Sequence, residues 1–435
     1  MDFRTHFFCH FTNYAECISS QKEDIVNPMR TTLTYVFITL LASTACHADS
    51  VSYLVAPTGQ QACYGTGGGE TPCASLPGQD AQNATGGLRY RDNNDGTVSD
   101  LNTGLMWQKT PAEKMTWDEA KSVAGRLKLG GKTDWRLPTI KELYSLINFS
   151  GAHGPQVLKP YIDTAYFDFR YGDTRLGERL IDTQFWSNTE YTGRTMGGNE
   201  TVFGVNFADG RIKGYPKHAP GNRSIGHRMF VRYVRGNSAY GRNDFVDNRD
   251  GTVTDRATGL MWMQIDSGAL KSGPLGDGRM NWTQALNWAA RLNYAGHADW
   301  RLPNAKELQS IVDYRRSPAT TRSAAIDPMF SSTPLRNEAG HEDYAQYWTS
   351  TTHLDGPRQG DAAVYIAFGE ALGHMRSPGG TTLQDVHGAG AQRSDPKQGD
   401  PSAFPQGRGP QGDVIRIYNG ARLVRTASPN TANLD

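Results

Sequence analysis

Residues 90–109 read YRDNNDGTVSDLNTGLMWQK, and residues 245–264 read FVDNRDGTVTDRATGLMWMQ. The segment Asp-Trp-Arg-Leu-Pro follows each stretch, at residues 134–138 and again at 299–303. Every tryptophan except Trp288 has a counterpart in the same order: Trp107 with Trp262, Trp117 with Trp282, Trp135 with Trp300, and Trp186 with Trp348. This order indicates an internal duplication. The chain is therefore predicted to contain two copies of one domain.

Each copy predicts the same short elements. Asp-Gly and Thr-Gly pairs in the repeated motif separate short alternating runs, which predicts successive antiparallel hairpins. Thr116 with Glu119, and Asn281 with Gln284, have the spacing of a capping box and predict one helix start per copy. An amphipathic run after each Asp-Trp-Arg-Leu-Pro segment predicts a second helix. The predicted fold class is therefore α+β, with two helices and short antiparallel strands in each copy.

The residues before the second helix could hold a sugar, because a carboxylate, an aromatic ring and a guanidinium occur together there. A structural role is the favoured alternative, with Trp135 buried and Arg136 paired to a carboxylate. Glu142 in copy 1 and Glu307 in copy 2 are candidates for that carboxylate.

The N-terminal region has the order of a signal peptide. Arg30 precedes about ten apolar residues and then several small ones, a run too short to span a membrane. Residues 1–48 are expected to comprise an upstream stretch and a signal peptide. We expect translation to start at Met29, cleavage after Ala48 to remove the signal peptide, and no membrane span afterwards. The protein is then exported to the periplasm, the cell surface or the medium. A lipoprotein anchored through Cys46 is the alternative.

Two cysteines, Cys63 and Cys73, remain after this leader, and they predict a small disulfide loop. The predicted organisation is an N-terminal extension at 49–87, copy 1 at 88–236, a linker at 237–242, copy 2 at 243–425 and a tail at 426–435. Copy 2 includes a Gly-, Pro- and Gln-rich stretch at 377–412. We predict a mobile surface insertion there, because the stretch has too few apolar residues to order itself.

The repeated motif carries oxygen-bearing side chains that could bind calcium, namely Asp92, Asn94, Asp95, Asp100, Asp247, Asp250 and Asp255. An EF-hand loop needs glycine at its sixth position, whereas Gly96 is fifth from Asp92. A hairpin turn in which the carboxylates bind backbone N–H groups is the favoured alternative. Apart from this possible calcium, no cofactor is expected. No nucleophile motif is present, and the histidines lack the spacing of metal ligands, so the protein is predicted not to be an enzyme.

The net charge of +1 argues against a nucleic-acid partner. One region is nevertheless basic, and guanidinium groups there suit sulfate or carboxylate groups of a glycan. The predicted anionic-glycan site comprises Arg211, Lys213, Lys217, Arg228, Arg232 and Arg235, with Tyr215 for stacking. The alternative is a solvated strand face whose arginines pair with acids from elsewhere in the chain.

Through the motifs quoted above, most of residues 57–236 and 243–425 resembles the Lcl C-terminal domain family, named for a bacterial surface collagen-like adhesin. The order of elements is similar to the C-type lectin-like fold, so the resemblance implies two tandem lectin-like domains without catalytic residues. It also implies a secreted or surface-exposed protein, because one member is associated with sulfated glycan binding and adhesion. We expect an exported binding or adhesion module that contacts an anionic glycan or a surface protein. The alternatives are a structural or assembly component of the cell envelope and an unrecognised hydrolase; the oligomeric state is not predicted.

Overall fold

The computed structural model describes residues 52–427 apart from 85, 220–221 and 378. The predicted leader, its cleavage after Ala48 and the possible lipid anchor at Cys46 lie outside the described residues. Within the described residues, no helix has the length and apolar character needed to cross a membrane.

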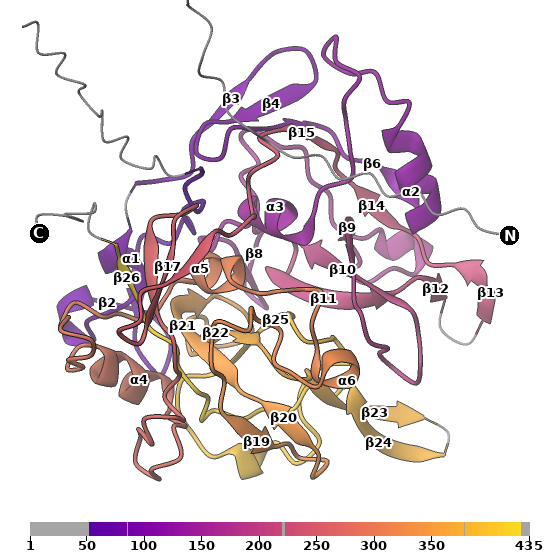
Figure 1. Cartoon of the computed structure of the whole chain (residues 1–435). Helices are drawn as coiled ribbons and strands as arrows, with labels where there is room; N and C mark the ends of the chain where they lie inside the picture. Colours follow the sequence, from indigo (N-terminus) through magenta and orange to yellow (C-terminus); the bar gives the residue numbers. More distant parts are fainter. Residues whose placement is uncertain (1–51, 85, 220–221, 378, 428–435) are drawn as a thin grey trace, which may run out of the picture. The chain divides into compact units, whose positions relative to one another are not determined.

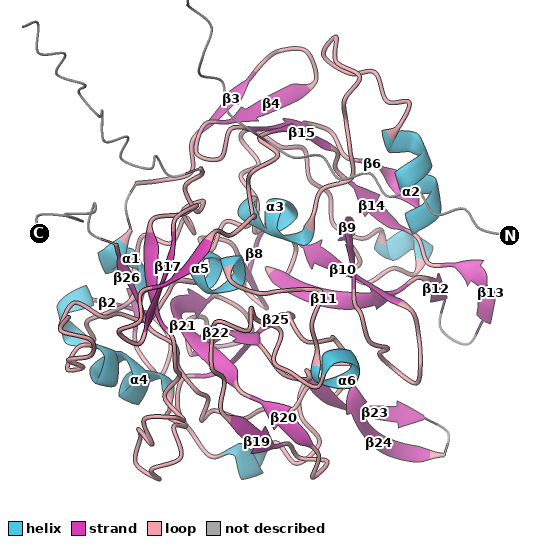
Figure 2. Cartoon of the chain, viewed as in Figure 1, coloured by secondary structure: helices cyan, strands magenta, loops and turns pink. Residues whose placement is uncertain are grey.

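Strands dominate the structure (Figure 2). They hold 33% of the residues, and helices hold 12%. The predicted α+β class, with two C-type lectin-like domains of two helices each, is therefore wrong. The helices are α1 (Asp80–Asn83), α2 (Trp117–Ala124), α3 (Ile140–Ser145), α4 (Trp282–Ala289), α5 (Ala305–Ser310) and α6 (Pro318–Thr321), and shorter 3-10 turns cover Cys73–Ser75, Thr174–Leu176 and Pro401–Ala403. A capping box fixes where a helix begins but not how far it runs, so the sequence overstated the helical share.

An eight-stranded sheet receives strands from both copies (Figure 1). In spatial order its strands are β21 (Gln346–His353), β22 (Ala362–Ala367), β25 (Gln392–Pro396), β11 (Arg211–Pro216), β10 (Thr201–Asn206), β9 (Gln184–Glu190), β14 (Met229–Val231) and β6 (Ala112–Met115). The copies meet where β11 pairs antiparallel with β25, at Ile212 and Gln392.

The repeated motif forms a matching four-stranded sheet in each copy. Copy 1 has β15 (Val234–Gly236), β5 (Leu105–Gln108), β4 (Thr97–Asp100) and β3 (Tyr90–Asp92) in that order, and copy 2 has β16 (Phe245–Asp247), β17 (Thr252–Asp255), β18 (Leu260–Met263) and β26 (Val424–Thr426). Two-stranded hairpins complete the structure. They are β1 (Cys63–Tyr64) with β2 (Glu70–Thr71), β7 (Ala152–Gly154) with β8 (Val157–Lys159), β12 (His218–Ala219) with β13 (Asn222–Gly226), β19 (Pro334–Arg336) with β20 (Glu342–Tyr344), and β23 (Leu372–Ser377) with β24 (Gly380–Asp385).

The stretch at 377–412, for which the sequence predicts a mobile surface insertion, is not simply a loop. It contributes β24 and also β25, which lies inside the eight-stranded sheet. Asp395 of β25 is fully buried, and its carboxylate accepts hydrogen bonds from the backbone N–H groups of Arg416 and Ile417. Polar residues are thus ordered here by distant partners, which composition alone cannot reveal.

Buried tryptophans anchor each copy in the same way. The indole N–H of Trp117 donates to the carbonyl of Ser187 at 2.9 Å, and that of Trp282 donates to the carbonyl of Thr349 at 2.7 Å. The predicted capping boxes are confirmed at the starts of α2 and α4. The repeated residues therefore build the scaffold.

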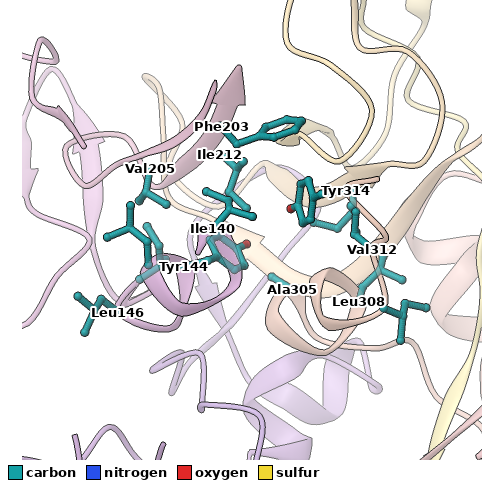
Figure 3. Packing of buried hydrophobic residues seen from close by; sticks show 14 of the residues in the cluster. Ile140, Tyr144, Leu146, Phe203, Val205, Ile212, Ala305, Leu308, Val312 and Tyr314 are labelled. Carbon is teal, nitrogen blue, oxygen red and sulfur yellow. The ribbon is translucent and has the colours of Figure 1, made fainter. Parts of the chain in front are cut away.

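Helices α3 and α5 pack against each other between the copies (Figure 3). Lys141 of α3 donates to the carbonyl of Ser310 at 2.5 Å, and Lys306 of α5 donates to the carbonyl of Ser145 at 2.6 Å. These two bonds are equivalent across the duplication, because each lysine reaches the end of the opposite helix. The copies are thus related locally by an approximate two-fold axis.

The N-terminal extension contacts both copies: the backbone N–H of Phe149 in copy 1 donates to the carbonyl of Thr58, and the later part of the extension packs on copy 2. Its predicted disulfide is present between Cys63 and Cys73. The side chain of Gln60 exchanges hydrogen bonds with the backbone of Thr352, and helix α1 lies against β21.

Candidate functional site

A cavity of about 660 Å³ opens where the two copies join, and we call it the junction pocket. Copy 1 contributes β11 and the turn before it, and copy 2 contributes β22, β25 and residues 408–415. This volume is within the usual range for small-ligand sites. The pocket also unites the two segments in which the copies differ most, namely the basic region of copy 1 and the insertion of copy 2.

The copy 1 wall carries a buried charge cluster. Arg211 and Lys213 are two residues apart on β11, so their side chains lie on the same face. The Lys213 ammonium is 2.9 Å from a carboxylate oxygen of Asp209, and Arg211 is 3.5 Å from that same oxygen. Burial would raise the pKa of Asp209, but Lys213 and Arg211 outweigh it and hold the pKa below its usual value. Burial lowers the pKa of Lys213 to about 8.

Asp355 joins the two copies electrostatically. Its carboxylate lies 2.5 Å from Arg211 and 3.1 Å from the imidazole of His153. Burial opposes ionisation, but Arg211 and then His153 outweigh it, so the pKa of Asp355 is far below its usual value. The hydrogen bond to Asp355 raises the pKa of His153. Asp355 is therefore ionised at neutral pH and pairs with Arg211.

Arg393 supplies the main unsatisfied groups of the pocket. One of its terminal nitrogens pairs with Asp413, but Nε and Nη1 have no hydrogen-bond partner among the described residues. The side chain is only 11% exposed. Burial, and next the like charge of Arg211, lower the pKa of Arg393 to about 10. Unpartnered buried donors of this kind are rare in folded proteins and call for an acceptor.

The rim adds further basic groups. Arg408 is exposed and lies 4.2 Å from the ring centre of Phe404, and Arg358 pairs with Asp361 at 3.1 Å. Five basic side chains line the pocket against four carboxylates: Arg211, Lys213, Arg358, Arg393 and Arg408 against Asp209, Asp355, Asp361 and Asp413. The lining thus has a small excess of positive charge.

The structure does not bring the seven predicted glycan-binding residues together. Only Arg211 and Lys213 line the junction pocket. The others are paired elsewhere or buried: Lys217 with Glu190, Arg228 with Glu119, Arg235 with Asp134, and Tyr215 in the core of copy 1. Lys217, Arg228 and Arg235 thus fit the alternative interpretation, in which the basic residues pair with acids from elsewhere in the chain.

Arg232 has a structural role that the sequence analysis missed. It is fully buried, and its guanidinium donates to the carbonyls of Gln108, Lys109 and Asp168. Arg422 occupies the matching place in copy 2 and donates to backbone carbonyls in the same manner. An arginine recurs in the sequence just before the last strand of each copy, and this recurrence could have indicated that Arg232 belongs to the scaffold.

Comparison with known proteins identifies the repeated unit. The Lcl C-terminal domain matches residues 96–235 and again residues 251–382, which together are more than half of the chain. The chain belongs to the Lcl C-terminal domain family. No curated protein and no solved structure matches it.

The second Lcl C-terminal domain match ends before β25. Arg393, Arg408 and Asp413 of the junction pocket therefore lie outside the matched range. Sequence analysis missed these residues because the stretch around them has no apolar alternation.

The acidic loops of both Lcl C-terminal domains are hairpin turns. Asp92 and Asp247 accept hydrogen bonds from the backbone N–H two residues later, at 2.9 and 2.8 Å, and Asp95 and Asp250 do the same at 3.0 and 2.9 Å. Asn94 is a turn residue with a left-handed backbone, φ 57°. Asp100 and Asp255 also accept from backbone N–H groups. In the part of the chain that the structure describes, no group of three or more His, Cys, Asp or Glu is placed to hold a metal ion.

We predict that millimolar calcium chloride will change the melting temperature by less than about 1 °C, because these carboxylates are already used by the turns. Differential scanning calorimetry with calcium and with chelator makes the comparison. A rise that saturates with calcium and disappears in Asp95→Asn would instead identify a calcium loop.

Proposed function

We propose that the chain is an exported, non-enzymatic binding protein that holds a carboxylated or sulfated glycan in the junction pocket. The observation that carries this proposal is Arg393, whose buried Nε and Nη1 lack partners beside the charged groups of Arg211 and Lys213. The N-terminal signal-peptide order supports export.

The unpartnered atoms favour an anionic glycan over other ligands. A buried donor without an acceptor costs about 1–3 kcal/mol. Nε and Nη1 of Arg393 have almost no accessible surface, so the Arg393 side chain must turn toward the pocket before a carboxylate or sulfate oxygen can accept from them and remove this penalty. Asp209 adds an unpartnered carboxylate oxygen, which is an acceptor for a ligand hydroxyl. A sugar that bears one acidic group and several hydroxyls supplies both kinds of partner.

The state of the carboxylates supports binding rather than hydrolysis. A glycosidase needs one carboxyl group that keeps a proton at its working pH. Asp209 and Asp355 instead have lowered pKa values and are paired with basic side chains. The two ionised carboxylates hold the basic side chains in place, which suits the binding of an anionic ligand rather than its hydrolysis.

A glycan array at low and high salt tests this proposal with the mature chain, residues 49–435. We expect binding to uronate-bearing or sulfated oligosaccharides, weaker binding at high salt, and background signal from the neutral counterparts. Arg393→Gln will weaken binding by about tenfold or more, because one charge-assisted contact is lost.

Two further variants complete the design. Arg408→Gln changes an exposed rim residue and should weaken binding even if Arg393→Gln lowers stability. Arg175→Gln is the matched control, since Arg175 is 88% exposed, pairs with Asp173 and lies outside the pocket. The proposal fails if no anionic glycan binds above background, or if folded Arg393→Gln and Arg408→Gln bind as well as the control.

A further inference from the structure

An open cleft of about 850 Å³ lies at the start of α3, distinct from the junction pocket. We call it the copy 1 cleft after α3, although the linker and residues 311–315 of copy 2 also line it. Arg136, Thr139 and Glu142 line it together with Thr189 and the linker residue Arg242. The Arg136–Glu142 ion pair lies on its wall, with nitrogen-to-oxygen distances of 2.6 and 2.5 Å.

The duplication provides an internal comparison for this cleft. In copy 1 the hydroxyl oxygen of Thr189 accepts from the backbone N–H of Ile140 at 3.0 Å. In copy 2 the hydroxyl oxygen of Thr351 accepts from the backbone N–H of Ala305 at 2.9 Å. Thr189 and Thr351 are thus equivalent residues at the starts of equivalent helices.

In copy 2 this place is occupied by the N-terminal extension. Thr351 donates its hydroxyl proton to the carboxylate of Asp80 at 2.5 Å, and Asp80 is buried at the start of α1. The same carboxylate interacts electrostatically with Arg301 and Glu307, the counterparts of Arg136 and Glu142. A segment that presents a carboxylate therefore fills the site in copy 2.

Exposure of the equivalent arginines follows this difference. The Arg301 side chain is 20% exposed, whereas that of Arg136 is 36% exposed. Gly78 of the extension lies beside Leu286 of α4, and the equivalent residue in copy 1 is Lys121, which lines the open cleft. Copy 1 thus keeps the threonine and the ion pair of the site but has a lysine where copy 2 has an apolar contact.

The charge of the cleft indicates what would cover it. Among its lining residues, basic side chains outnumber carboxylates five to three. Three of the basic side chains are already ion-paired, namely Arg136 with Glu142, Arg315 with Asp313 and Lys121 with Asp118. The exposed Arg242 forms no ion pair with a described residue and carries most of the available charge. The Thr189 hydroxyl accepts from the backbone N–H of Ile140 but donates to no described residue, whereas the Thr351 hydroxyl donates to Asp80. An acidic segment complements both features.

We propose that the copy 1 cleft binds an acidic peptide segment of a partner protein, with a carboxylate of that segment accepting from Thr189 as Asp80 accepts from Thr351. The chain has a single N-terminal extension, which is already docked on copy 2. The proposed occupant of the copy 1 cleft is a segment of another protein, chosen by its charge. This site is independent of the junction pocket.

The probe is a fluorescein-labelled peptide with the sequence of residues 76–84, LPGQDAQNA, titrated against the mature chain by anisotropy. We expect saturable binding that weakens about tenfold or more when the peptide aspartate is replaced by asparagine. Thr189→Val should cause a similar loss, and Thr189→Ser should restore binding because it keeps the hydroxyl. Thr133→Val, which changes an exposed threonine outside the cleft, is the matched control.

Arg242→Gln provides a second test if Thr189→Val destabilises the start of α3. It should weaken binding several-fold without affecting the fold, because Arg242 is exposed. Arg393→Gln should leave peptide binding unchanged, which separates this proposal from the junction pocket. The inference is overturned if the peptide does not bind, or if the asparagine peptide or Thr189→Val binds equally well.

Discussion

Glu307→Gln will lower the free energy of unfolding by about 3 kcal/mol, because it leaves the guanidinium of Arg301, whose side chain is only 20% exposed, without its charge partner. The two side chains form a bidentate pair at 2.7 and 2.6 Å. Glu307 also accepts from the backbone N–H of Asn304 in the capping box of α5. Glutamine keeps an acceptor for that N–H, so the decrease in the free energy of unfolding will come mainly from the lost ion pair. Urea unfolding followed by circular dichroism measures the difference.

Glu142→Gln is the matched variant in copy 1. Arg136 is more exposed than Arg301, so water can compensate its charge, and we expect a smaller loss of about 1–2 kcal/mol. The double variant Arg301→Met with Glu307→Leu should recover most of the stability lost in Glu307→Gln, since no buried charge remains. Equal losses at Glu142 and Glu307 would contradict the expectation that the lower exposure of Arg301 makes the copy 2 pair the more costly to break.

Lys306→Met will remove much of the increase in stability that the protein gains as the pH rises above neutral. Burial lowers the pKa of Lys306 from 10.5 to about 7. Between these two values the unfolded chain binds more protons at this site than the folded chain, so the free energy of unfolding rises with pH. The slope from one such group is about 1.4 kcal/mol per pH unit.

Unfolding of the wild type and Lys306→Met at about pH 8 and 9.5 gives the comparison. The stability of the wild type relative to the variant should increase by about 2 kcal/mol over this interval. Lys132→Met, which changes an exposed lysine, is the control and should follow the wild type. Parallel curves for the wild type and Lys306→Met would show that Lys306 stays charged in the folded protein, held by the carbonyls of Pro57 and Ser145.

The sequence was sufficient to predict features that involve residues close together in the chain or repeated in the same order. The paired tryptophans indicated the duplication, and the family match confirms two Lcl C-terminal domains. Thr116 with Glu119 marked the start of α2, and Cys63 with Cys73 indicated the disulfide. The suggested pairing of Arg136 with Glu142 is also present. Each of these signals involves residues that are close in the chain or are repeated in order.

The location of the basic residues could not be predicted in this way. The sequence grouped Arg211, Arg228 and Arg232 by proximity along the chain. The structure separates them, because consecutive strand residues alternate between faces and the strands diverge after β11. Arg211 lines the junction pocket, Arg228 lies at the surface beside Glu119, and Arg232 is buried beneath backbone carbonyls.

The sequence by itself determined the duplication, the turns and caps, and the residues that form the scaffold of each copy. Only the tertiary structure decided the mostly β architecture, the junction pocket and the unequal covering of the two copies. The reason is that β25 finds its neighbour β11 in the other copy, and helix α1 of the N-terminal extension covers the start of α5 in copy 2 but not the start of α3 in copy 1. Such contacts join residues far apart in the chain, and their hydrogen bonds order polar segments that have no apolar pattern of their own.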